Sequence, residues 1–386
     1  MAFAPSNVTI AYLILLSCII FWGSYAPLRR TSNNVDGASF GSLAFIAELL
    51  WSCFISMTFG SMGVKGGSSS ILDSETNFFT RLASDVATNP GQSCLVLLGG
   101  ALVGFGDSMS FVVLKYVPSS LAFPTVVGTC TLVGTTISYF VDGSEKPVLL
   151  FSGVILLIPS VILLAYAQSK SEAAGVTTPA QSMSATNTSK TIIVELVKQT
   201  SEIPNSAADS TDEETETNPI RSAKKKSATW KWIALLVAIG CINSLWGPLS
   251  TVGRRNCSIH SGYFLLSMGR IGIQPISQSL TQLIIFHRSP INLLYQIYNV
   301  PRRDKCCAFG CGLLIGLGYY TYFIGSNVVN KSAAFAISNC SPLWTIVIGV
   351  CVQHDLKRYR SEAKIAVIFS TICFVVAVTL LSFSGA

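Results

Sequence analysis

The sequence alternates between long apolar stretches and shorter polar connections. Ten stretches are long and apolar enough to cross a hydrocarbon core about 30 Å thick. They cover residues 8–27, 39–60, 93–115, 119–141, 147–168, 230–251, 262–286, 306–329, 332–352 and 364–384. Because a bilayer offers no water to satisfy backbone hydrogen bonds, each stretch is predicted to be a helix. The predicted fold class is an all-α membrane protein with ten transmembrane helices.

One long polar segment, residues 169–229, interrupts this pattern. It is rich in Ser, Thr, Ala, Asp and Glu and includes an acidic run at 212–216. A segment with so few large apolar residues cannot bury enough surface to offset the entropy of ordering, so we expect a disordered linker. The linker separates a first five-helix repeat, residues 1–168, from a second, residues 230–386.

Composition and charge place the chain in a membrane and orient it. Half of the 386 residues are hydrophobic and only 12% are charged, which excludes an ordinary soluble domain. Of the 26 Lys and Arg residues, nineteen fall on the side of the central linker and six on the opposite side. The positive-inside rule therefore predicts a cytosolic linker and extracellular or luminal termini. Of the possible membranes, we expect the plasma membrane rather than an internal one.

Several sequence patterns occur twice in the same order. "FWGSYAPLRR" begins at Phe21 and "LWGPLSTVGRR" at Leu245, and "GFGDSMSFVVLKYVPSSLAF" from Gly104 matches "GLGYYTYFIGSNVVNKSAAF" from Gly316 without a gap. "LLFSGVIL" at residues 149–156 similarly matches "VIFSTICF". This order predicts a duplication. A unit with five crossings ends on the face opposite its start, so the second copy must be inverted, as in carriers that work by alternating access.

Three ionisable residues lie inside the apolar stretches. Glu48 and Asp107 fall in the second and third stretches, and Arg270 falls in the seventh. Charged groups are costly in a bilayer, so each is a candidate for substrate or proton binding. Glu48 and Arg270 lie on matching segments of the two repeats and are predicted to face one cavity. Either carboxyl group could alternate between charged and neutral forms and so carry a proton.

Polar and aromatic side chains extend the predicted site. Gln274 and Gln278 continue a polar stripe from the arginine of the seventh stretch, and they would line the cavity. Trp22, Trp246 and Tyr319 offer ring faces on which a planar substrate could stack. Two alternatives stay open: the polar stripe could instead join helices, and the tryptophans could belong to the aromatic belt of the membrane interface.

No pattern of catalytic or metal-binding residues is present in the sequence. The three histidines, His260, His287 and His354, lie at loops or helix ends, and no nucleophile and base stand at motif spacing. The twelve cysteines lack metal-site spacing. We therefore expect no enzymatic activity, no cofactor, no metal and no nucleic-acid partner. The expected partners are a small-molecule substrate, a proton and the lipid bilayer. A receptor or scaffold whose linker recruits cytosolic proteins is an alternative function.

Some motifs resemble a known group of transporters. "SYFVDG" at residues 138–143, together with the predicted arrangement of five plus five helices, resembles the drug/metabolite transporter superfamily. "NFFTRLASD" at 77–85, "VGTTISYFVD" at 133–142 and "LLFSGV" at 149–154 are similar to the ureide permease family within it. This resemblance implies a secondary transporter for planar, nitrogen-rich ureides or nucleobases such as allantoin, uracil and xanthine, coupled to protons.

The resemblance also has an alternative and two departures. The segment from Gly23 to Arg30 is similar to a pattern of carbohydrate transporters in the same superfamily, which keeps a carbohydrate or another metabolite open as substrate. Asp107 stands where ureide permeases carry an amide. The linker lacks the GxxxxGK pattern of plant ureide permeases, so no nucleotide site is expected.

Overall fold

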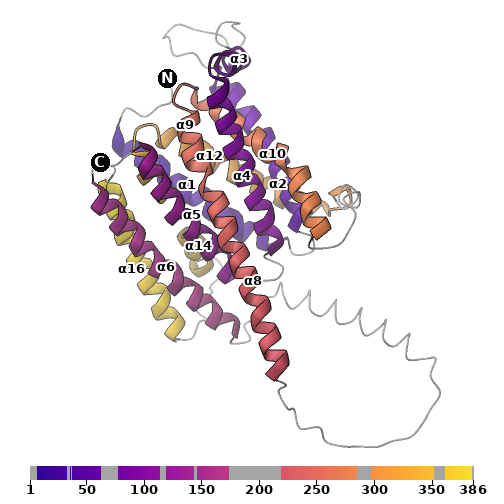
Figure 1. Cartoon of the computed structure of the whole chain (residues 1–386), viewed down its shortest axis with the longest axis vertical. Helices are drawn as coiled ribbons and strands as arrows, with labels where there is room; N and C mark the ends of the chain where they lie inside the picture. The colour runs from indigo at the N-terminus through magenta and orange to yellow at the C-terminus, as the bar shows by residue number, and fades with distance from the viewer. Residues whose placement is uncertain are drawn as a thin grey trace, which may run out of the picture.

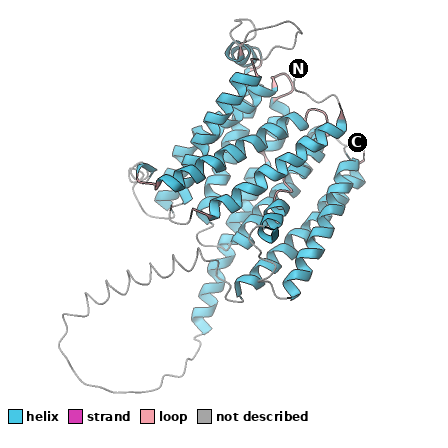
Figure 2. Ribbon diagram, turned by 180° about the vertical axis from the view of Figure 1, so that it is seen from behind, coloured by secondary structure: helices cyan, strands magenta, loops and turns pink. Residues whose placement is uncertain are grey.

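The computed structural model describes residues 7–32, 35, 37–61, 77–113, 119–142, 146–173, 219–284, 297–351 and 361–384. Within these ranges every regular element is a helix (Figures 1 and 2). The helices are α1 (Val8–Arg30), α2 (Gly37–Phe59), α3 (Phe78–Thr88), α4 (Pro90–Val113), α5 (Ser119–Asp142), α6 (Pro147–Ala173), α8 (Pro219–Ser244), α9 (Trp246–Gly253), α10 (Ile259–Ile284), α12 (Arg302–Gly325), α13 (Lys331–Ser338), α14 (Pro342–Cys351) and α16 (Ser361–Ser384).

Helical residues lie within each of the ten apolar stretches that the sequence predicts. Six segments are candidate membrane spans by length and composition: Val8–Arg29, Gly37–Phe59, Pro90–Val113, Lys231–Gly253, Arg302–Gly325 and Ser361–Leu381. The all-helical fold and its membrane character are therefore confirmed, whereas ten crossings remain a prediction.

Two of the predicted helices are interrupted. One break lies at Leu245, between α8 and α9, and the other at residues 339–341, between α13 and α14. Pro248 and Pro342 each stand four residues after the last residue of the preceding helix. Since proline has no backbone N–H, it cannot donate the i to i−4 hydrogen bond that would continue that helix. The two prolines therefore favour these breaks, but proline alone is not sufficient, since Pro27, Pro159 and Pro275 lie inside α1, α6 and α10.

The structure corrects the boundaries of the predicted linker. Helix α6 continues to Ala173 and α8 begins at Pro219, so helix covers both ends of the segment expected to be disordered. The N-terminal part of α8 is polar but contains Ala, Lys and Arg, which are strong helix formers, so polarity alone was a poor guide there. Residues 174–218 lie outside the described residues. A short helix that the sequence analysis did not predict, α3, is capped by the Asn77 side chain.

The helices form one bundle, from which the start of α8 projects (Figure 1). Helices α6 and α16 lie side by side at one edge, and reciprocal hydrogen bonds join Ser160 and Ser370: each hydroxyl donates to the other residue's carbonyl, at 2.9 and 2.7 Å. Elsewhere α10 packs on α4 and α2, α12 packs on α1 and α2, and α4 packs on α9. These contacts bring segments from both ends of the chain together around one interior.

Glycine allows the closest of these helix contacts. A Cβ atom at Gly100 of α4 would collide with the backbone carbonyl of Leu266 in α10, and one at Gly312 of α12 would collide with that of Ala44 in α2. Small residues that let two backbones approach are a common means of joining membrane helices, which gain little from the hydrophobic effect.

We predict that Gly100→Ala destabilises the protein by about 1–3 kcal/mol, because the added methyl group meets rigid backbone. Gly272→Ala on α10 is the matched control, since nothing lies within 4 Å of its added Cβ. Thermal unfolding of both variants in detergent measures the difference. Equal melting temperatures would show that the α4–α10 contact tolerates a side chain.

Candidate functional site

Three charged side chains meet in the interior of the bundle. Arg270 of α10 donates through Nη1 to Glu48 Oε1 of α2 at 2.9 Å and through Nη2 to Asp107 Oδ2 of α4 at 2.7 Å. The side chains of Arg270 and Glu48 are 1% exposed and that of Asp107 is 27% exposed. One guanidinium therefore bridges carboxylates from two other helices, and we call these three residues the charged trio.

Aromatic rings cover the rest of the guanidinium. Its Cζ lies 4.5 Å from the ring centre of Phe45 and 4.7 Å from that of Tyr319, distances at which a cation is attracted to a ring face. With both carboxyl groups ionised, the charged trio carries one surplus negative charge. A buried surplus charge is costly, so the arrangement favours the uptake of a proton or of a ligand that donates hydrogen bonds to the exposed carboxylate.

An amide on α8 reaches the same carboxylate. Asn243 Nδ2 donates to the second oxygen of Asp107, Oδ1, at 3.2 Å. Asn243 lies near the end of α8, just before the break at Leu245. Asp107 therefore accepts hydrogen bonds from both α8 and α10. Of the two carboxylates in the charged trio, it is the one that is partly exposed.

Three aromatic side chains form a cluster beside the trio. Trp22 of α1, Trp246 of α9 and Tyr319 of α12 pack edge to face, with ring centres 5.0 to 5.9 Å apart. The indole of Trp22 also donates to the carbonyl of Ile315 at 3.3 Å, and Trp246 is only 2% exposed. Both tryptophans thus lie inside the bundle, and the sequence-based alternative of a membrane-interface belt is wrong for them.

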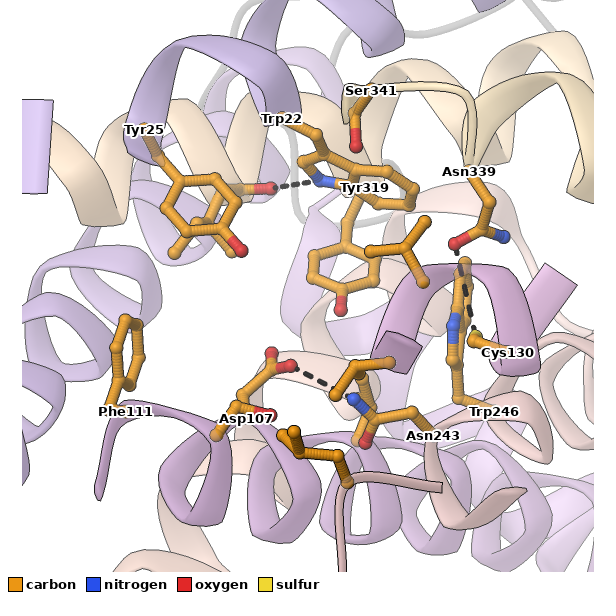
Figure 3. Close-up of a pocket in the computed structure, with 16 residues that line it drawn as sticks. Trp22, Tyr25, Asp107, Phe111, Cys130, Asn243, Trp246, Tyr319, Asn339 and Ser341 are labelled. Atoms are coloured by element: carbon orange, nitrogen blue, oxygen red, sulfur yellow. Dashed lines mark hydrogen bonds between the residues drawn. The ribbon is translucent and has the colours of Figure 1, made fainter. Parts of the chain in front are cut away.

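A cavity of about 90 Å³ lies between the aromatic cluster and Asp107 (Figure 3). This exceeds the roughly 10–15 Å³ that one water molecule requires on the same measure. Four of the predicted site residues line the cavity, namely Trp22, Asp107, Trp246 and Tyr319. Asn243 also lines it, with its Nδ2 on Asp107 and its Oδ1 buried against Gly106 of α4. The cavity therefore combines ring faces with one polar end, as ligand pockets do.

The other four predicted site residues do not line the cavity. Glu48 and Arg270 are buried next to it, joined to it through Asp107 and the Tyr319 ring. Gln274 donates to Ser108 of α4 at 2.7 Å, and Gln278 donates to the carbonyl of Ala38 in α2 at 3.2 Å. The two glutamines therefore join α10 to α4 and α2, which is the alternative role considered for the polar stripe. Their contact with substrate remains a prediction.

Several cavity residues were absent from the sequence-based set. They include Tyr25, Ser110, Asn243, Asn339 and Ser341. Asn243 and Asn339 lie next to the two helix breaks, so Pro248 and Pro342 were the signals that could have located them. In membrane carriers, interrupted helices commonly supply the binding site.

The bundle of apolar helices defines an integral membrane protein with a cavity between its helices. The family model described as ureide permease matches residues 43–245, which is more than half of the chain. The chain belongs to the ureide permease family. Because this is a family of transporters, the protein is a transporter of a small molecule and not an enzyme.

Two individual proteins are similar over almost the whole chain. Ureide permease 1 of Arabidopsis thaliana is 23% identical over 368 residues, which cover 88% of this chain and 87% of that protein. A protein of known crystal structure matches with a TM-score of 0.56 and 13% identity, covering 96% of this chain and 97% of the other. At that identity the second similarity concerns the fold alone.

We predict that Arg270→Gln lowers the free energy of unfolding by about 3–5 kcal/mol, because it leaves Glu48 buried and unpaired. Combining it with Glu48→Gln should restore much of the loss, since the unpaired charge is removed as well. Unfolding of the single and double variants in detergent measures both effects. A double variant as unstable as Arg270→Gln would contradict the pairing.

Proposed function

We propose that the protein takes up a planar, nitrogen-rich ureide or nucleobase together with a proton, and that it works by alternating access between two inverted five-helix repeats. The observation that carries the proposal is the cavity, in which a partly open carboxylate faces a cluster of aromatic rings. Allantoin, uracil and xanthine are the proposed substrates. Membership of the ureide permease family and the name of the similar Arabidopsis protein support this class.

The chemistry of the cavity suits such a substrate. The faces of Trp22, Trp246 and Tyr319 can contact a flat ring, while the Asp107 carboxylate accepts a hydrogen bond from a ring N–H. The Nδ2 of Asn243 can donate to an adjacent carbonyl of the substrate. A sugar can also pack a ring face on an aromatic side chain and donate a hydroxyl to a carboxylate, so the preference for a heterocycle rests on membership of the ureide permease family.

Contacts between α2 and α10 support the inverted repeat. Ser56 donates to the carbonyl of His260 at 3.3 Å, and Gln278 donates to the carbonyl of Ala38 at 3.2 Å. The donors Ser56 and Gln278 each lie eight residues after the charged trio residue of their own helix. The acceptors Ala38 and His260 each lie ten residues before the charged trio residue of their own helix. A two-fold rotation that exchanged Glu48 with Arg270 would exchange these two hydrogen bonds as well.

The packing of the other helices follows the same exchange. Helix α1 packs on α12 as its counterpart α9 packs on α4, and α2 packs on α12 as α10 packs on α4. The halves also differ, because α1 and α5 are continuous whereas their counterparts α8–α9 and α13–α14 are broken. Two copies of one unit in different conformations are what alternating access requires. We place the repeats in residues 1–168 and 230–386 and the fold in the drug/metabolite transporter superfamily.

Arg254 closes the end of the bundle that is farther from the cavity. Its guanidinium donates to the carbonyl of Phe323 at 3.1 Å and to the Ser326 hydroxyl at 2.9 Å, and it stacks over the Phe323 ring. It is 8% exposed, and among the described residues no carboxylate pairs with it. The last carbonyls of α12 attract this cation, which joins α9 to α12. With positive-inside orientation, this closed end faces the outside and the cavity belongs to an inward-facing state in the plasma membrane.

We predict that Arg254→Gln opens this end of the bundle, because it removes two charge-assisted hydrogen bonds between α9 and α12. Cys257 is buried three residues further on and serves as the reporter. Its labelling by a thiol reagent, followed by mass spectrometry, should become about tenfold faster or more. Ser326→Ala removes only one acceptor and should have a smaller effect. Unchanged labelling in Arg254→Gln would exclude a closing role.

Asp107 is the proposed proton acceptor. The groups around it are Arg270 of α10, Glu48 of α2 through that arginine, Asn243 of α8, Tyr25 of α1, Cys130 of α5 and Tyr319 of α12. Glu48 is 1% exposed and stays paired with Arg270, whereas Asp107 opens into the cavity. A proton from solution can therefore reach Asp107 without breaking the Glu48–Arg270 pair.

We predict that Asp107→Asn abolishes accumulation driven by a pH gradient but keeps counterflow exchange of labelled allantoin or uracil in proteoliposomes. The amide cannot release a proton, so transport loses its coupling while the cavity keeps its shape. Glu48→Gln is the comparison and should retain pH dependence. If Glu48→Gln loses the pH dependence and Asp107→Asn keeps it, Glu48 is the proton acceptor instead.

A further inference from the structure

The cavity has a second polar end at the break between α13 and α14. Asn339 and Ser341, both in this break, line the cavity on the side away from Asp107 and Asn243 (Figure 3). Tyr319 and the two tryptophans lie between these ends. A substrate held against the rings would therefore present one edge to Asp107 and its other edge to Asn339.

One hydrogen bond fixes the side-chain amide of Asn339, and its oxygen accepts only a weak hydrogen bond. Its Nδ2 donates to the carbonyl of Phe335 at 2.9 Å, which completes the C-terminal turn of α13. This hydrogen bond orients the side chain and leaves Oδ1 directed toward the Cys130 thiol, at 3.9 Å. A thiol is a weak donor, and an amide oxygen has two lone pairs, so Oδ1 retains the capacity to accept an N–H.

The first repeat carries an apolar residue at the matching position. In the alignment that places Gly104 over Gly316, Asn339 corresponds to Val127, which lines the same cavity. The wall of the cavity is therefore apolar at this position in continuous α5 and polar at the break between α13 and α14. Asn339 is partly exposed, and it adds a polar group to the wall of the cavity where α5 has none.

We propose that Asn339 determines substrate specificity by accepting a hydrogen bond from an N–H on the substrate edge opposite the one that Asp107 binds. The carrier then requires a flat ring with N–H groups on two separate edges. This inference rests on the proposed function, because it assigns the second contact of the same substrate. A site that hydrogen-bonds an N–H strongly rejects an analogue that lacks it.

Competition by simple cyclic ureides tests the proposal. Hydantoin has two N–H groups, and its 1-methyl and 3-methyl derivatives each lack one of them. We expect hydantoin to inhibit uptake of labelled allantoin or uracil by the wild-type protein in proteoliposomes, and each methyl derivative to be at least about tenfold weaker. Asn339→Val should bind hydantoin about tenfold more weakly and should no longer discriminate against one of the two derivatives, while it still rejects the other.

Controls separate specificity from stability and from the proposed function itself. Cys130→Ala removes the thiol partner of Oδ1 and should keep the wild-type order of inhibition. Asn339→Ala adds no volume and repeats the test if the valine variant does not fold. Because the readout is a ratio between two derivatives, a merely less stable carrier would leave it unchanged. If the Asn339→Val variant still rejects both methyl derivatives, the proposal is wrong. If the wild-type protein takes up neither allantoin nor uracil, the proposed function is wrong.

Discussion

The bridge from Arg270 to Glu48 and Asp107 is the interaction on which the rest of the site depends. A bilayer gives a charged side chain no water, so each charge must find its partner within the protein. Here one planar guanidinium joins α2, α4 and α10 and packs between two rings, which fixes the three helices around the cavity. The trio also leaves one negative charge in excess at Asp107, where the cavity begins. The same interaction thus joins three helices and, under the proposed function, provides the group that binds a proton and a substrate.

Helix breaks provide the other polar groups. A continuous helix uses all of its internal backbone hydrogen bonds and offers only side chains to a cavity, whereas a break frees backbone groups and turns short polar residues inward. Asn243 lies before one break and Asn339 within the other, and both line the cavity. A proline follows the start of each break and removes one backbone donor there, without any loss of apolar character. The candidate spans therefore remain apolar enough for the membrane while the interior becomes polar locally.

The cavity lies where the matched segments of the chain differ chemically. Trp22 and Trp246 occupy equivalent positions and are alike, but Glu48 is matched by Arg270, Asp107 by Tyr319 and Val127 by Asn339. Identical charges at the first of these pairs would repel each other across a dry contact, so opposite charges are the arrangement that electrostatics allows. If the two halves are copies of one unit, as we propose, duplication supplies the aromatic faces, and divergence supplies a carboxylate at one end of the cavity and an amide at the other.

The sequence by itself determined the membrane class, the apolar stretches that become helices, the polar segment between them and the three buried charges. These features can be read along the chain without knowledge of its folding. The thickness of the hydrocarbon core sets the length of a span, and charged residues are rare within spans because burying them is costly. Only the tertiary structure decided that Arg270 reaches both carboxylates, that Gln274 and Gln278 join helices, and that Asn339 faces the cavity. Sequence spacing gives the face of a helix on which a side chain lies, whereas its partner depends on how residues more than a hundred positions apart are packed together.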